Sequence, residues 1–170
     1  MHLSLDLETL DLTATSIVLS IGIVAFDSKG IYSALELNPS IDEQLRKGRT
    51  VSESTFLWWL GREHEAREKI IEARRISLEE TLATITLFVK ALGTIDGVWG
   101  NGSDFDNAIL NHLYEGTPPW SFWLNRDLRT LREYNPRVTM AREGVYHSAL
   151  DDAKYQAAII SAIIYKETTC

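Results

Sequence analysis

The stretch HLSLDLE at residues 2–8 alternates leucines with polar residues and so has the two-residue period of a β-strand. Because successive side chains of a strand point to opposite faces, the three leucines share one face and Asp6 and Glu8 share the other. The Cβ atoms of the two acids then lie about 6.5 to 7 Å apart, where two anions repel unless a positive group lies between them. A divalent cation would supply that charge. The alternative is a solvent-facing edge strand whose acids serve solubility.

The composition predicts one acidic globular domain over residues 1–170. The chain has 45% hydrophobic and 24% charged residues with only four prolines, which is typical of a folded protein and not of a disordered one. Its formal net charge of −7 argues against a protein that coats nucleic acid through bulk positive charge. A polyanionic partner would therefore have to meet a local cluster of basic side chains or bound metal ions.

Cysteine content and hydropathy bear on the compartment. Cys170 is the only cysteine and cannot form an internal disulfide, and no stretch resembles a signal peptide, so we expect a cytoplasmic location. The longest apolar run, SIVLSIGIVAF at residues 16–26, is about half the length of a membrane-spanning helix, which needs about 20 residues. We expect a buried strand there and no contact with a membrane.

The order of elements predicts an α/β domain. Strands are expected over residues 2–8, 17–26 and 31–37, with connections short enough for antiparallel pairing, and a short buried strand over 97–100. Helical periodicity predicts helices over residues 52–60, 62–73, 78–92, 104–114, 127–134 and 149–165. Strands followed by a mixture of strands and helices indicate a partly antiparallel sheet flanked by helices.

A second group of acids follows the strand at 97–100, in NGSDFD at residues 101–106. Acids in a first helical turn are favoured by the helix dipole, so either aspartate could serve that purpose alone. We assign this structural role to Asp104. Asp106 follows Phe105, an apolar side chain that would hold the turn against the sheet, and is the candidate functional acid.

The third group is HSALDDA at residues 147–153, where the last helix begins. At 100° per residue, Asp152 falls inside the apolar arc of this helix, whereas Asp151 projects to the polar side. A buried carboxylate needs a partner or a metal ion, while Asp151 is explained as a capping-box partner of Ser148. His147 precedes the helix and is either a structural histidine or a proton acceptor.

These elements can converge at one end of the sheet. Four carboxylates would balance the charge of two divalent cations, and a pair of such ions is a known device for cleaving phosphodiesters. A nearby histidine with a pKa near neutrality could take the proton of the attacking water. Bound metal ions would also explain how an acidic protein holds a polyanionic substrate.

The ordered motifs resemble the DEDDh 3′-to-5′ exonucleases, within the ribonuclease H-like superfamily. DLET at residues 6–9 looks like the first motif, NGSDFD the second and HSALDDA the third. The resemblance covers nearly the whole chain and is strongest to the phage-type exonucleases and to a bacterial ribonuclease that degrades adenylate tracts. It implies a five-stranded mixed sheet flanked by helices.

The resemblance also implies roles and partners. Two Mg²⁺ or Mn²⁺ ions would be bound by Asp6, Glu8, Asp106 and Asp152. His147 would be the general base, and Glu8 would help to orient the water. The expected reaction releases nucleoside 5′-monophosphates from the 3′ end of single-stranded DNA or RNA, often by a homodimer.

Substrate contacts are less sharply defined. Thr9 and Leu10 match the place where relatives contact the terminal nucleotide, although Leu10 could equally be a packing residue. Asn101 in the second motif is a further candidate. Arg126, Arg129 and Arg132 recur every third residue, and Arg129 is the candidate for a backbone contact; a solvated helix face is the alternative. Trp58 and Trp59 could stack on bases or form core or dimer contacts.

Two other functions remain open. A ribonuclease H-type endonuclease also groups acids on such a sheet, and a catalytically weak nucleic-acid-binding module could retain the fold. The presence of all five expected chemical groups, His147 included, favours the exonuclease. The sequence does not distinguish DNA from RNA, because the group that would meet a 2′-hydroxyl cannot be located in it.

Overall fold

The sheet has five strands and is mixed in direction. The computed structural model describes residues 1–165, so Cys170 lies outside the described residues. In sheet order the strands are β3 (Gly30–Leu37), β2 (Val18–Asp27), β1 (His2–Thr9), β4 (Gly97–Gly100) and β5 (Asn125–Asp127). β1 pairs antiparallel with β2 and parallel with β4, while β3 is antiparallel to β2 and β5 is parallel to β4. This confirms the predicted ribonuclease H-like arrangement, with β1 at its centre.

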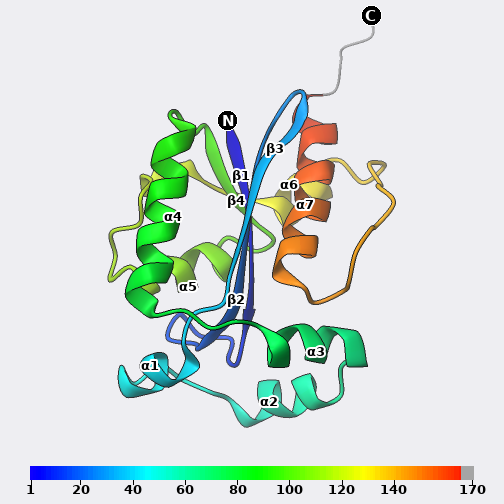
Figure 1. Cartoon of the computed structure of the whole chain (residues 1–170). Helices are drawn as coiled ribbons and strands as arrows, with labels where there is room; N and C mark the ends of the chain where they lie inside the picture. Colours follow the sequence, from blue (N-terminus) through cyan, green and yellow to red (C-terminus); the bar gives the residue numbers. More distant parts are fainter. Residues whose placement is uncertain (166–170) are drawn as a thin grey trace, which may run out of the picture.

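Helices cover both faces and one end of the sheet. They are α1 (Ile41–Arg46), α2 (Glu53–Leu60), α3 (His64–Glu72), α4 (Leu78–Leu92), α5 (Asp106–Leu113), α6 (Leu128–Glu133) and α7 (Ala149–Ile164), with a 3-10 helix at Phe122–Leu124. Figure 1 shows α4 and α5 on one side of the sheet, α7 on the other, and α1 to α3 at one end. No helix in residues 1–165 is both long and apolar enough to cross a membrane.

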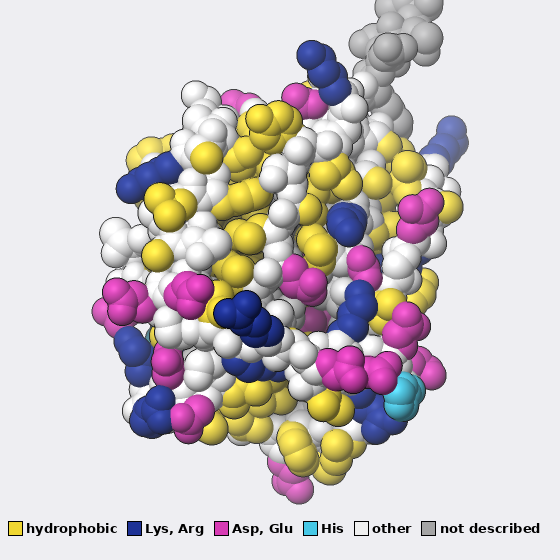
Figure 2. Space-filling view, viewed as in Figure 1, with side chains coloured by type: hydrophobic (Ala, Val, Ile, Leu, Met, Phe, Trp, Pro, Cys, Tyr) yellow, Lys and Arg dark blue, Asp and Glu magenta, His cyan; other side chains and the backbone are white. Residues whose placement is uncertain are grey.

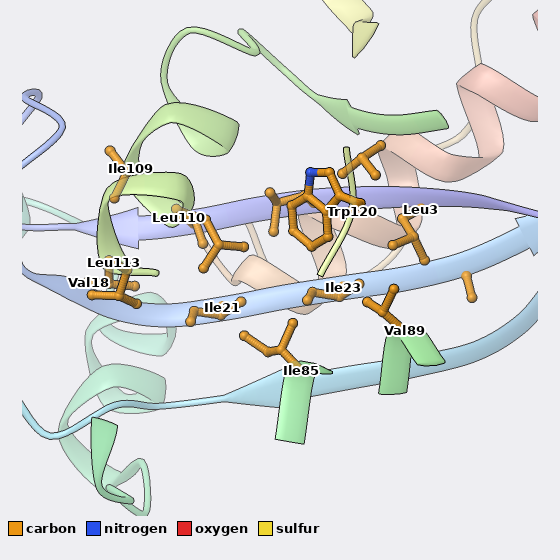
Figure 3. Close-up of a cluster of buried hydrophobic side chains, with 14 of the residues drawn as sticks. Leu3, Val18, Ile21, Ile23, Ile85, Val89, Ile109, Leu110, Leu113 and Trp120 are labelled. Carbon is orange, nitrogen blue, oxygen red and sulfur yellow. The ribbon is translucent and has the colours of Figure 1, made fainter. Parts of the chain in front are cut away.

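The two faces of the sheet bury two separate apolar clusters. The larger cluster joins the leucines of β1 to α4 and α5, and Figure 3 shows Leu3, Ile23, Ile85, Val89 and Trp120 converging in it. The smaller cluster packs α7 against the opposite face, where it includes Phe26, Trp99 and Ile160. Since the leucines of β1 point into the first cluster, the acids of the same strand must point toward α7.

A glycine sets how closely α7 approaches the sheet. Gly22 on β2 lies directly opposite Asp6 on β1. A Cβ atom built on Gly22 would lie 2.2 Å from the carbonyl oxygen of Ala149, the first residue of α7. No real side chain could occupy that position without moving the backbone of the helix. The N-terminal turn of α7 is therefore held against β2 by direct backbone contact beside Asp6.

Three local predictions were wrong. The helix α1 was not predicted, because its six residues show little periodicity; the buried Gln44 holds it by bonding the backbone N–H and C=O of Val18 at 2.8 and 2.9 Å. The strand β5 was not predicted, and Asp127, expected as the first residue of a helix, instead ends this strand and caps α6 by accepting from the N–H of Thr130 at 2.8 Å. Finally, α5 begins at Asp106, so Asp104 lies outside its first turn.

Candidate metal centre and active site

The carboxylates of Asp6 and Glu8 project from β1 toward α7. Asp6 accepts a 2.6 Å hydrogen bond from Nε2 of Gln156 on α7, and Glu8 is buried where the pairing of β1 with β2 becomes irregular between Glu8 and Thr9. The strand continues beyond its pairing with β4, which ends at Leu5 and Gly100. The acids therefore lie at an open corner of the sheet rather than on a solvent-facing edge.

Asp106 reaches this corner from the first turn of α5. Its Oδ1 accepts a hydrogen bond of 3.1 Å from the backbone N–H of Leu7, the residue between Asp6 and Glu8. That N–H is available because β4 has already ended, and Asp106 thus satisfies a backbone donor that no strand pairs. The bond fixes Asp106 beside both acids of β1.

Asp152 reaches the same corner from the first turn of α7. Its Oδ2 accepts from the backbone N–H of His147 at 3.2 Å. One ligand atom each from Glu8, His147 and Asp152 all lie within 4.8 Å of one another, a spacing at which one cation could contact all three. The structure thus brings together the four acids and the histidine that the sequence singled out, from three separate segments of the chain.

The site opens into a cavity of about 540 Å³ whose walls carry opposite charge. Asp6, Glu8, Asp106 and Asp152 line it together with His147. Arg129, Arg132 and Arg142 line it as well, from α6 and from the loop before α7. A cavity with both kinds of charge can hold cations against the carboxylates and a phosphate against the guanidinium groups.

Burial raises the pKa values of three of the acids, and repulsion by neighbouring carboxylates adds to the shift for Asp6 and Glu8. Burial is the largest cause for Asp6, whose pKa lies well above its ordinary value, and the charges of Asp106 and Glu8 add to it. Burial next to Asp106 raises the pKa of Glu8 to about 8. Burial raises the pKa of Asp106 to about 7, although hydrogen bonds from the backbone of Leu7 and Asn101 oppose the shift.

The raised pKa values of these carboxyl groups indicate whether the residues could bind a metal ion. Buried carboxylates that raise one another's pKa lack positive charge, and an oxygen-rich group of this kind is what Mg²⁺ and Mn²⁺ prefer. Within residues 1–165 the cavity supplies Arg142 and Arg129 as partial compensation, and both lower the pKa values of neighbouring acids. The donor set of Asp6, Glu8, Asp106 and Asp152 fits a divalent metal site.

His147 is held in an unusual backbone conformation. Its φ of 61° lies in the left-handed region, which costs a non-glycine residue energy and so requires support from its surroundings. The ring of Trp58 lies edge-on at 4.8 Å, and Trp59 lies at 6.4 Å. Burial lowers the pKa of His147, and the charges of Arg62 and Arg142 lower it further. The imidazole is therefore kept neutral and able to accept a proton near pH 7.

A lysine from α3 supports the turn that follows His147. Nζ of Lys69 donates to Oγ of Ser148 at 2.9 Å and to Oδ2 of Asp151 at 2.7 Å. The predicted capping of the helix by Ser148 is wrong, since its side chain accepts no helical N–H. Asp151 instead accepts from Lys69 and from the backbone N–H of Val145 at 3.1 Å, which ties the entry loop to α3.

The predicted substrate residues fall into two groups. Asn101 and Arg129 line the cavity, and a Cβ on Gly102 would lie 3.0 Å from the guanidinium of Arg129. Thr9 and Leu10 are not among the residues that line it; the hydroxyl of Thr9 donates to the carbonyl of Asp11 at 2.8 Å. The carbonyl of Thr9 accepts from Nε1 of the buried Trp59 at 2.8 Å.

The candidate tryptophans and arginines also differ in whether they line the cavity. Trp59 is buried, so packing is its role, whereas Trp58 is partly exposed and lines the cavity. The predicted arginine stripe is wrong in one member, because Arg126 belongs to β5 and donates to the carbonyl of Trp123 at 2.6 Å. Arg129 and Arg132 both line the cavity from α6.

Sequence reasoning missed two groups at the site. Gln156 lies four residues after Asp152 and thus on the same helix face, so its polar side chain within the apolar arc was a usable signal. Arg142 lies in an irregular loop, where no periodicity points to it, yet it forms an ion pair with Asp152. Tyr146 and Tyr155 line the cavity beside that arginine.

Sequence comparison agrees with this arrangement. A family model described as the 3′-5′ exoribonuclease Rv2179c-like domain matches residues 1–164. The chain belongs to this family. The Rv2179c-like domain is a 3′-5′ exonuclease and therefore a hydrolase, as the motifs indicated. Comparison with curated protein sequences gives no match.

Solved structures show the same fold. The nuclease domain of 3′hExo, described as a DEDDh family member bound to rAMP, matches with a TM-score of 0.60 and 16% identity, over 97% of this chain and 92% of that one. A 3′-exonuclease described with a histone mRNA stem-loop matches with a TM-score of 0.62 and 15% identity, over 97% and 81%. The cell-death related nuclease CRN-4 matches with a TM-score of 0.55 and 16% identity, over 97% and 64%.

Proposed function

We propose that this Rv2179c-like domain removes nucleoside 5′-monophosphates from the 3′ end of single-stranded RNA with the help of two divalent ions, Mg²⁺ or Mn²⁺. The convergence of four acids and one histidine on a single cavity carries the proposal. The family description favours RNA over DNA as the substrate. Four carboxylates match the charge of two divalent ions, and DEDDh nucleases use such metals.

The residues of the site would have two roles, binding the metal ions and accepting a proton. Asp6, Glu8, Asp106 and Asp152 would hold the metal ions, which lower the pKa of water and neutralise the phosphate oxygens when bound. His147 would accept the proton of the attacking water, as its neutral imidazole lies beside Glu8 and Asp152. Glu8 would also orient that water. Arg129 and Asn101, which line the cavity near Asp106, would contact the strand.

Matched substrates test the reaction. Single-stranded RNA and DNA of one sequence, each with a 3′ label, and an adenylate oligomer are incubated with the protein in Mn²⁺, Mg²⁺ or EDTA. We expect metal-dependent release of labelled mononucleotide, fastest from RNA. Fragments from a circular RNA would instead identify an endonuclease of the ribonuclease H type. Binding of RNA with no turnover in either metal would identify a binding module.

We also propose that the domain forms a homodimer through α2. This helix exposes Phe56, Leu57 and Leu60, and Trp58 on the same helix lines the cavity. Figure 2 shows hydrophobic side chains gathered at the lower end of the molecule, over α2. An apolar patch beside the site is suited to contact with a second copy. Light scattering of the purified chain and of Leu57→Glu tests this, since the substitution should yield monomers.

A further inference from the structure

One cation of the active-site cavity has no place in the metal site or in the proton transfer. Arg142 lies in the loop between α6 and α7, and its guanidinium forms an ion pair with Oδ1 of Asp152. The side chain is only 15% exposed. Its guanidinium carbon lies 3.8 Å from the ring centre of Tyr146 and 5.1 Å from that of Tyr155. Two aromatic rings thus hold a planar cation at the metal-binding corner.

The hydrogen bonds of Arg142 leave donors free. A guanidinium carries five N–H donors, and within residues 1–165 the only hydrogen bond of this side chain is that of Nη2 with Asp152. Nε is buried without a partner among the described residues, and Nη1 likewise donates to no acceptor there. A structural arginine normally uses most of its donors on protein acceptors. Arg49 does so, since its three nitrogens bond Ser16, Ala14 and His112.

Arg142 lies beside the acids of the active site, where the substrate's phosphate would bind. It faces Asp152 directly, and its charge lowers the pKa values of both Asp6 and Glu8. A phosphodiester cleaved at this corner would have to approach these acids, which would hold the metal ions. Arg129 and Arg132 lie on the exposed surface of α6, whereas Arg142 is largely shielded from water. A shielded, preoriented guanidinium binds phosphate oxygens more strongly than a solvated one.

We propose that Arg142, through its free N–H donors, binds a non-bridging oxygen of the scissile phosphodiester, which becomes the 5′-phosphate of the released nucleotide. The inference rests on the proposed function and identifies a substrate-binding residue of that same site. Tyr146 and Tyr155 position the guanidinium. Asp152 fixes its orientation through Nη2, so the residue that would bind a metal ion also aligns the group that holds the phosphate.

Binding of a product and of its uncharged analogue tests this directly. Titration calorimetry in Ca²⁺ compares AMP with adenosine on the wild type, on Arg142→Gln and on Arg142→Lys. We expect Arg142→Gln to weaken AMP binding by about 10- to 100-fold, as for the loss of a hydrogen bond to a charged group, and to leave adenosine unchanged. Arg142→Lys should recover part of the loss, since it restores the charge without the planar fork.

Controls separate this inference from folding and from the proposed function. Arg137→Gln changes an exposed arginine of the same loop that does not line the cavity and should bind AMP like the wild type. Circular dichroism and Mn²⁺ titration of Arg142→Gln check that fold and metal site are intact. Three results for Arg142→Gln would overturn the inference: an equal loss of affinity for AMP and adenosine, no loss of AMP affinity, or tighter Mn²⁺ binding together with faster cleavage. In each case an active wild type would still support the exonuclease. An inactive wild type would instead count against the proposed function.

Discussion

The two faces of β1 differ in what fills the space beside them. On one face Leu3, Leu5 and Leu7 are buried in the larger apolar cluster, against α4 and α5. On the other face the carboxyl groups of Asp6 and Glu8 point toward α7, where burial and the charge of Asp106 raise the pKa of each. One strand of eight residues thus contributes to stability through one face and carries a cost in stability on the other. Substitutions on the two faces should therefore have opposite effects.

The largest effect on activity is expected for Asp6→Asn. The amide keeps the shape of the side chain but removes the charge that would hold a cation, which is worth several kcal/mol. We expect RNA cleavage in Mn²⁺ to fall by at least about 10³-fold. The free energy of unfolding in EDTA should not fall, because the substitution removes repulsion from Glu8 and Asp106. Urea denaturation measures the second result, and retained activity would refute the site.

A smaller loss is expected for His147→Ala. Removal of a general base lowers the rate by about 10²- to 10⁴-fold, while Mn²⁺ affinity should stay nearly intact. Calorimetric titration with Mn²⁺ distinguishes this from coordination, because the imidazole also lies within 4.8 Å of ligand atoms of Glu8 and Asp152. A large loss of affinity would make His147 a ligand. His64→Ala, on the exposed surface of α3, is the matched control.

The opposite face is tested by Leu5→Ala. Leu5 is fully buried in the larger cluster, so we expect the free energy of unfolding to fall by about 2 to 5 kcal/mol. Cleavage per folded molecule should change little, since the leucine points away from the cavity. Leu87→Ala on the exposed side of α4 should change stability by less than about 0.5 kcal/mol. A Leu5→Ala protein that is stable but inactive would contradict the division between the faces.

Acidification should stabilise the metal-free protein. The pKa of Glu8 is raised to about 8 and that of Asp106 to about 7, above their ordinary values of 4.5 and 3.8. A raised pKa in the folded state contributes stability that is fully present below the unfolded value and is lost as pH rises through the folded value. In EDTA the melting temperature should therefore fall between about pH 4 and pH 8. Added Mn²⁺ should raise it more at pH 8 than at pH 6.

The smallest effect is expected for Lys69→Met, which removes a support of the His147 turn and not a group of the cavity. We expect kcat to fall by about tenfold as the imidazole loses its alignment, with KM nearly unchanged. Lys69→Arg should recover much of the rate, because it can still donate to Ser148 and Asp151. A change in KM alone would show that Lys69 contacts the substrate instead.

Periodicity predicted the parts of the fold that follow one repeat over many residues. β1, α4 and α7 each bury a regular pattern, β2 is a continuous apolar run buried on both faces, and Asp152 stood out because it interrupts the apolar arc of α7. The short elements depend on contacts distant in sequence. Gln44 holds α1 against Val18, and β5 exists because three polar residues pair with β4. No local pattern encodes such a partner.

The sequence identified the site residues that belong to a recognisable motif, but not those whose role depends on the tertiary structure. The four acids and His147 form motifs, so the sequence singled them out. The position of Arg142 depends on the fold of its loop, which brings the guanidinium close to the rings of Tyr146 and Tyr155. The role of Lys69 depends on α3 lying beside the start of α7. The left-handed backbone of His147 is likewise a product of its surroundings.

The absence of a side chain at Gly22 determines how close Asp152 on α7 can lie to Asp6 on β1. Since the backbone of Ala149 touches the space where a Cβ would lie, any other residue at position 22 would push the start of α7 outward and carry Asp152 away from Asp6. A homologue could therefore keep all five motif residues and still be inactive. Surveys that infer activity from the motif alone should include the residue that faces Asp6 across the sheet.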